Sequence, residues 1–185
     1  MSTVAAAGSQ NLWFVSRASG LVLLVLFSVV VVLGVATRTG SAPRRWPRFA
    51  VAELHRTLSL FAVALLVLHV VTAILDPFVT IGWAATVLPF ASPYRTLAIG
   101  LGTLAMDLGG AVLLTSVLRQ RLGQRTWRAV HWLAYLAWPA AFIHSLTAGN
   151  DLGIWWVALT EVSSAAAVAA AVLARVFSRP ALEVP

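Results

Sequence analysis

Long apolar runs constrain this chain more than any other feature. Five segments are each long enough to cross a ~30 Å hydrocarbon core, which takes about 20 helical residues. They lie near residues 12–37, 52–76, 94–118, 127–148 and 153–177. Only 10% of the 185 residues are charged, which is too few to cover a soluble domain of this size. We therefore predict an all-α fold, a polytopic membrane bundle of about five transmembrane helices that forms one domain over residues 1–185.

The basic residues predict the topology. All thirteen are arginines, and eleven of them flank the spans on one side: Arg38, Arg44, Arg45, Arg48, Arg56, Arg119, Arg121, Arg125, Arg128, Arg175 and Arg179. Because arginines beside apolar spans mark the cytoplasmic side, we expect the N-terminus outside and the C-terminus in the cytoplasm. Abundant Ala and Arg without Lys suggest a bacterial cell (inner) membrane. The arginines serve topology in this interpretation, so no nucleic acid partner is expected.

Several other patterns narrow the chemistry. The first span is too long for a signal peptide and ends in "VATRTGSAPRRWPR" rather than a small-residue cleavage site. There are no cysteines, which excludes disulfides, iron–sulfur clusters and covalently attached haem. "GLGTLA" lies inside a span, so its glycines, with Gly109 and Gly110, are expected to allow close helix packing. The connector at 77–93 is expected to rest on the outer surface.

The four histidines fall on two spans. His55 and His69 are 14 residues apart on the second span, and His131 and His144 are 13 apart on the fourth. At 1.5 Å per residue each pair is separated by about 20 Å along its helix. Because these spans run in the same direction, His55 shares a depth with His131 near the cytoplasmic face. His69 shares a depth with His144 near the outer face.

This spacing favours a flat cofactor over a simple metal ion. A zinc ion needs ligands about 2.0–2.1 Å away, which histidines 20 Å apart on one helix cannot both provide. Two imidazoles per level, one from each helix, suit the two axial positions of a haem. A 13-residue step returns to about 220° around an ideal helix. We expect Pro139 to kink that span and adjust the phase. Isolated polar histidines and a histidine-based proton channel or small transporter remain alternatives.

The sequences around the histidines resemble a known family. "LHRTLSLFAVALLVLHVVTAIL" and "WRAVHWLAYLAWPAAFIHSL" are similar to the ferric reductase-like transmembrane domain superfamily. Its members include the membrane domains of NADPH oxidases and ferric reductases and the haem subunit of the methionine sulfoxide reductase system. The resemblance implies two b-type haems, an inner one bound by His55 and His131 and an outer one bound by His69 and His144. That family usually has six spans, so a partner could supply the sixth helix.

Other polar and aromatic residues are candidates for supporting roles. Arg56 and Arg128 lie at the depth of the inner haem, and Arg17 and Arg95 are the only cations on the outer side. Each could bind a haem propionate, or serve topology or snorkel. Trp132 and Trp138 could pack on haem edges or in the core. Asp107 and Glu161 lie within spans, where a carboxyl group either orients a ligand histidine or bonds, protonated, to a neighbouring helix.

These features predict a membrane electron-transfer subunit of an oxidoreductase. Electrons would come from a cytoplasmic donor or from quinol and leave to an extracytoplasmic acceptor. The resemblance to the oxidase branch does not extend to its cytoplasmic FAD and NADPH domains, so we expect separate redox partner proteins, among them an extracytoplasmic flavoprotein. The surface for that acceptor would be formed by residues 77–95 and 146–153.

Overall fold

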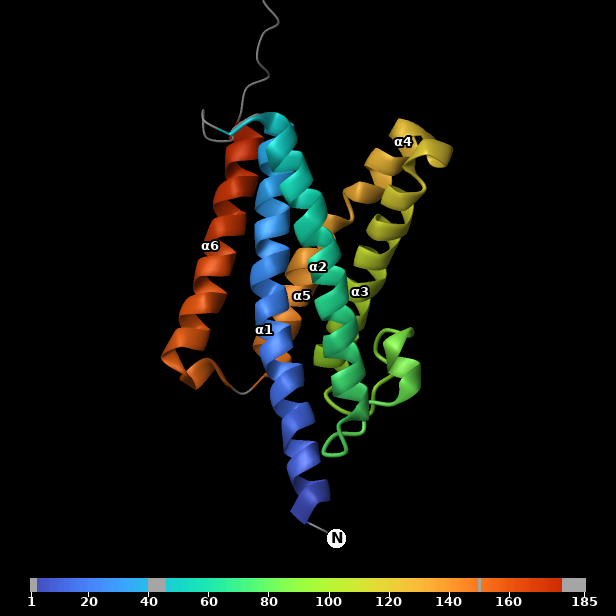
Figure 1. Cartoon of the computed structure of the whole chain (residues 1–185), viewed down its shortest axis with the longest axis vertical. Coiled ribbons are helices and arrows are strands. Elements are labelled where there is room, and N and C mark those ends of the chain that lie inside the picture. Colours follow the sequence, from blue (N-terminus) through green and yellow to red (C-terminus); the bar gives the residue numbers. More distant parts are fainter. Residues whose placement is uncertain (1–2, 40–45, 150, 178–185) are drawn as a thin grey trace, which may run out of the picture.

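The computed structural model describes residues 3–39, 46–149 and 151–177, and every regular element within them is helical. This confirms the predicted helical bundle (Figure 1). The elements in chain order are α1 (Thr3–Thr39), α2 (Arg48–Leu75), η1 (Trp83–Thr86), α3 (Thr96–Val117), α4 (Arg119–His131), α5 (Ala134–Ala148), η2 (Asp151–Gly153) and α6 (Trp155–Phe177).

Four of these helices are long and apolar enough to cross a membrane. They are the described part of α1 from Gln10 to Arg38, all of α2, all of α3 and all of α6. The fourth predicted span, near 127–148, is not one helix. It is divided into α4 and α5 by Trp132 and Leu133, and α4 includes the polar connector, which begins at Arg119 and has a non-helical backbone at Gly123.

The division after His131 corrects the expected role of Pro139. The turn has short-range bonds, from Leu133 N to Val130 O at 2.9 Å and from Tyr135 N to Trp132 O at 3.0 Å. Such i→i+3 bonding has three residues per turn rather than 3.6, so each residue rotates the chain about 20° further. This carries His144 back toward the face occupied by His131. Pro139 itself lies within α5, which is continuous across it.

Helices pack in two antiparallel pairs. α2 lies along α1, and α3 lies along α5, while α1 also contacts α5 and α6. A small core joins α1, α5 and α6 through Val31, Trp138 and Val168. Burial of the Trp138 ring is compatible with its indole N–H because Nε1 donates to Ser28 Oγ at 2.9 Å. Trp138 therefore belongs to the core, which was one of its two expected roles.

The arginine-bearing segments gather at one end of the bundle. The end of α1, the start of α2, α4 and the end of α6 all lie at that end, opposite the 76–95 connector and η2 (Figure 1). Arg44, Arg45 and Arg179 lie outside the described residues. α2 and α5 thus run in the same direction, as the depth argument requires. Which end faces the cytoplasm stays a prediction.

The 76–95 connector folds back onto α3. Asp76 Oδ1 accepts a bond from Phe78 N at 2.9 Å, and Thr103 Oγ1 on α3 donates to Ala85 O at 2.6 Å. Large apolar side chains on its surface remain exposed, among them Phe78, Trp83, Val87 and Leu88. Exposed aromatic and aliphatic groups are typical of a segment at a membrane–water interface.

The glycines of α3 differ in whether they allow the close helix packing that was expected. A Cβ at Gly100 would lie 2.1 Å from the ring of Phe90, so this glycine makes room for the 76–95 connector. A Cβ at Gly102 would collide with the imidazole of His144. Gly109 and Gly110 have no neighbouring atom within 4 Å of such a Cβ. The expectation therefore holds for Gly102, which lets a side chain of α5 approach α3 closely, and finds no support at Gly100, Gly109 and Gly110.

Candidate functional site

A large cavity extends along the bundle between the two helix pairs. Its volume is about 2040 Å³, and residues of α1 through α6 line it. Sites for single small molecules have volumes of about 300–1,000 Å³, so this cavity could hold more than one large group. All four histidines line it: His55, His69, His131 and His144.

The structure brings the histidines together in two pairs. The ring centroids of His55 and His131 are 6.4 Å apart, and their planes meet at 63°. The centroids of His69 and His144 are 6.2 Å apart, and their planes meet at 79°. Each pair takes one imidazole from α2 and one from the α4–α5 segment. These are the partners that the shared depths predicted.

The separation within each pair suits one metal atom between two imidazoles. A nitrogen ligand lies ~2 Å from the metal, and the ring centroid lies ~1 Å beyond that nitrogen, so two axial imidazoles have centroids ~6 Å apart. Among the described residues, no group of three or more His, Cys, Asp or Glu side chains could hold a metal ion by itself. The remaining ligands would therefore have to come from the bound group, as they do in a porphyrin.

Three imidazoles are oriented by backbone carbonyls of neighbouring helices. Nδ1 of His55 donates to Val30 O at 3.0 Å, and Nδ1 of His69 donates to Ser16 O at 2.8 Å. On the other helix pair, Nδ1 of His144 donates to Ala98 O at 2.8 Å. A carbonyl oxygen only accepts, so the proton of a neutral ring resides on Nδ1. This assignment leaves Nε2 with its lone pair available for a metal.

His131 differs from the other three. Its Nδ1 is buried and has no hydrogen-bond partner among the described residues. The ring instead packs against Trp127, with centroids 5.0 Å apart. The histidine pairs, the oriented tautomers and the cavity volume together fit a flat, iron-containing group at each of the two levels.

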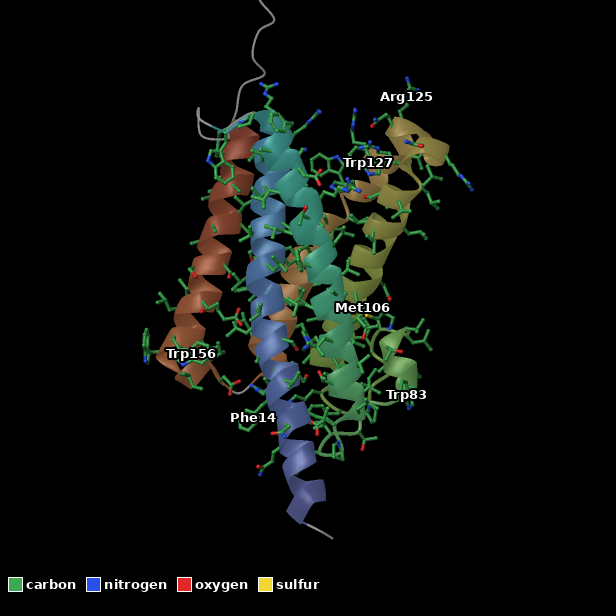
Figure 2. All side chains as sticks on the ribbon, in the orientation of Figure 1. Phe14, Trp83, Met106, Arg125, Trp127 and Trp156 are labelled. Carbon is green, nitrogen blue, oxygen red and sulfur yellow. The ribbon has the colours of Figure 1, made fainter. Side chains whose placement is uncertain are left out.

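Arginines surround the cavity at the end where His55 and His131 lie. Arg56 and Arg128 line it as expected, although both are exposed and Arg56 approaches Glu53 Oε2 only at 3.8 Å. Arg119 and Arg175 also line it and were interpreted from sequence only as topology determinants. Arg125 and Trp127 lie at this same end (Figure 2). Anionic groups such as propionates would meet several guanidinium groups there.

Trp132 lines the same end of the cavity, half exposed. The guanidinium of Arg175 lies 4.4 Å from its ring centroid, a cation–π contact. Arg175 Nη1 also donates to the hydroxyl of Tyr135 at 2.5 Å. Arg175 is therefore held at the cavity by two aromatic residues, and sequence spacing gave no signal for this.

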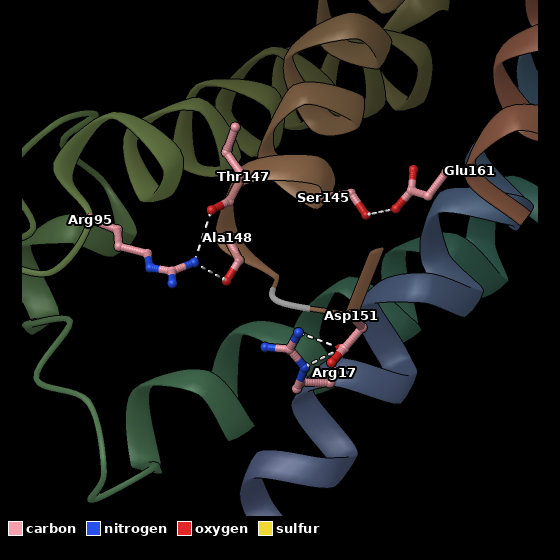
Figure 3. Close-up of polar contacts among 7 residues, drawn as sticks. All are labelled: Arg17, Arg95, Ser145, Thr147, Ala148, Asp151 and Glu161. Atoms are coloured by element: carbon pink, nitrogen blue, oxygen red, sulfur yellow. Dashed lines mark hydrogen bonds and ion pairs between the residues drawn. The ribbon is translucent and has the colours of Figure 1, made fainter. Parts of the chain in front are cut away.

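The two outer arginines have protein partners of their own (Figure 3). Arg17 forms an ion pair with Asp151 in which Nε donates to Oδ2 at 2.6 Å, and both residues line the cavity. Arg95 Nη1 donates to the carbonyls of Thr147 and Ala148, both at 3.0 Å, and it is not among the cavity-lining residues. Arg95 thus satisfies carbonyl groups at the end of α5.

The two carboxyl groups within spans do not orient a ligand histidine. Glu161 is buried on α6, and Ser145 Oγ donates to its Oε1 at 2.5 Å (Figure 3). This matches the expected bond to a neighbouring helix. Asp107 is exposed on α3 and is not among the residues that line the cavity.

A family model described as "Ferric reductase like transmembrane component" matches residues 19–142. The matched region covers about two thirds of the chain and includes His55, His69 and His131. No match is found among curated proteins or among solved structures.

Proposed function

The chain belongs to the ferric reductase-like transmembrane component family, and we propose that it binds two b-type haems and carries electrons across the membrane. The family implies membrane haem-based electron transfer in general. The number of haems, their ligands and the direction of transfer are our proposals. The observation that carries the number of haems and their ligands is the presence of two histidine pairs, with ring centroids 6.4 Å and 6.2 Å apart.

Each pair would bind one haem through Nε2 of both rings. His55 and His131 would form the inner site, and His69 and His144 the outer site. When bound, haem iron supplies one-electron exchange between its ferric and ferrous states. The chain's own contribution is to hold the rings at ligand distance, to fix their tautomers through Nδ1 and to keep water from the cavity between the helices.

Charged side chains would position the propionates. At the inner site the candidates are Arg56 and Arg128, to which the structure adds Arg119 and Arg175 as cavity-lining cations. At the outer site Arg17 is the remaining candidate, and it shares its charge with Asp151. Arg95 is the weaker candidate because its guanidinium bonds to the end of α5. Trp132 would contact the edge of the inner haem from the same end.

Electrons would enter from a cytoplasmic flavin reductase or a membrane quinol and leave to an extracytoplasmic acceptor. The docking surface for that acceptor would be formed by residues 77–95 and 146–153. The 76–95 connector and η2 lie at the end of the bundle opposite the arginine-bearing segments (Figure 1), which supports this placement. The lipid bilayer is a further partner of the protein.

The purified protein should show a Soret band that shifts on reduction with dithionite. A pyridine haemochrome assay should give two b-type haems per chain, because two histidine pairs can each hold one iron. A value of one haem would contradict the assignment of one of the pairs. A protein without any Soret band would leave the alternative of a histidine-based proton channel.

The N-terminus should face outward and the C-terminus inward. Eleven arginines lie on the side predicted to be cytoplasmic, and short loops rich in arginine are retained on that side. Fusions of alkaline phosphatase and of green fluorescent protein after residue 185 provide a matched test. Only the fluorescent fusion should be active, and an active phosphatase fusion would invert the proposed direction of transfer.

A further inference from the structure

The three carbonyls that orient imidazoles share a feature of their sequence. Each is followed four residues later by a glycine: Ser16 by Gly20, Val30 by Gly34 and Ala98 by Gly102. Side chains of an α-helix lean toward its N-terminus, over the turn that precedes them. A residue with a side chain would therefore cover the carbonyl four positions earlier, and a glycine leaves that carbonyl open to a neighbouring helix.

The imidazoles occupy the space that the missing side chains would take. A Cβ at Gly102 would lie 2.7 Å from Nδ1 of His144, and one at Gly20 would lie 2.9 Å from Cε1 of His69. At Gly34 the distance to Cε1 of His55 would be 3.3 Å. The first two contacts are too short for any side chain, and the third is tight. Each glycine thus provides both the room for a ring and access to its acceptor.

The spacing of the glycines repeats the spacing of the histidines. Gly20 and Gly34 are 14 residues apart on α1, as His55 and His69 are on the antiparallel α2. On α3, the residue 14 positions after Gly102 lies near His131, because it bonds to Trp127, whose ring packs against that of His131. That position is Ser116 instead of glycine.

Ser116 occupies the corresponding carbonyl oxygen on this part of α3, that of Val112. Its hydroxyl donates to Val112 O, four residues earlier, at 2.6 Å, and Thr115 Oγ1 approaches the same oxygen at 3.2 Å. Trp127 Nε1 in turn donates to Ser116 Oγ at 3.2 Å. The acceptor equivalent to Ala98 O is therefore occupied, and Nδ1 of His131 is the ring nitrogen left buried without a partner.

We propose that Gly20, Gly34 and Gly102 are positioning residues that open three carbonyls to the ligand histidines, and that Ser116 withholds the fourth. The two sites then differ. At the outer site both imidazoles donate to carbonyls, whereas at the inner site only His55 does so. This inference rests on the proposed haem ligands but goes beyond them, because it assigns roles to residues that touch no haem iron.

The difference has a direction in redox terms. A bond from Nδ1–H to a carbonyl makes the imidazole a more basic ligand. A more basic ligand stabilises the more positive ferric iron, and hydrogen bonding near the metal is one means by which a protein adjusts the potential of haem. The inner haem, which lacks one such bond, should have the higher midpoint potential. The arginines around its site act in the same direction.

The test is a spectroscopic redox titration of the purified two-haem protein and five variants, one of which is a control. His131→Ala and His144→Ala each keep one histidine pair, so they show which midpoint potential in the titration belongs to which haem. Gly102→Ala should raise the midpoint potential of the outer haem alone and weaken haem binding there by about 10-fold, the usual cost of losing an outer-shell partner. Ser116→Gly should lower the potential of the inner haem, a shift of opposite sign at the other site. Leu114→Ala is the matched control on the same helix, since its side chain is exposed and does not line the cavity.

Each outcome decides the inference. Opposite, site-selective shifts support it. If Gly102→Ala moves both haems equally, or moves neither while haem is still bound, then the glycine acts only in packing and the inference is wrong. If Ser116→Gly leaves the inner potential unchanged, the role of Ser116 is refuted. A protein with no haem at all refutes the proposed function instead, so the two failures are distinguishable.

Discussion

Replacing His144 with alanine should remove one haem per chain, leave the other in place and abolish electron transfer across the membrane. The reason is the pairing: His69 would face no second imidazole across the cavity, while the His55–His131 pair, about 20 Å away along the helices, is untouched. His69→Ala should give the same loss, and the double variant should be no worse than either single one. The pyridine haemochrome assay measures the loss of haem. Oxidation of a reduced dye enclosed in liposomes, by an acceptor outside them, measures electron transfer across the membrane.

The matched control is Ile143→Ala. Ile143 precedes His144 on α5, is exposed and does not line the cavity, so its loss should leave both haems. If His144→Ala retained two haems, or if Ile143→Ala lost one as readily, the outer pair would not be the ligand set.

NADPH alone should not reduce the haems of the purified protein in liposomes. The described residues form helices only, and a dinucleotide site of the common type needs a strand before its glycine-rich turn. Addition of a quinol or of a flavin reductase with flavin should reduce the haems, and an external ferric chelate should then reoxidise them. We expect no measurable haem reduction with NADPH alone and rapid haem reduction with NADPH and a flavin reductase.

The same liposomes containing the His144→Ala variant provide the control for the path. Its remaining haem should be reduced from the inner side but should not be reoxidised by the external chelate. Rapid haem reduction by NADPH without flavin or a second protein would overturn the requirement for a separate donor.

Much of the architecture could be predicted because it follows from counting. Apolar length predicted the four long apolar helices among the described residues, and the 14- and 13-residue separations predicted which histidines share a depth. Counting failed where local backbone geometry decides. Pro139 was the obvious disruption of the fourth span, yet the helix is divided at Trp132 and Leu133, where nothing in residue type marks it.

Contacts between helices were the harder part of the site. Arg17 and Arg95 looked equivalent in sequence, but one pairs with Asp151 and the other bonds to the end of α5. The glycines did carry a signal: Gly20 and Gly34 repeat the 14-residue spacing of the histidines. Its meaning needs the antiparallel packing of α1 on α2, which no single segment reveals.

The division of the bundle into an α1–α2 hairpin and an α3–α5 hairpin bears on how the protein is made. Each histidine pair takes one ring from each hairpin, and the more extensive packing between the hairpins is that of α1 against α5. A newly inserted chain can therefore complete both hairpins before the cofactors arrive. Haem bound as proposed would link α2 to the α4–α5 segment, in addition to the contacts that α1 already makes with α5 and α6, so we expect a chain without haem to be looser around α2 and more exposed to membrane proteases.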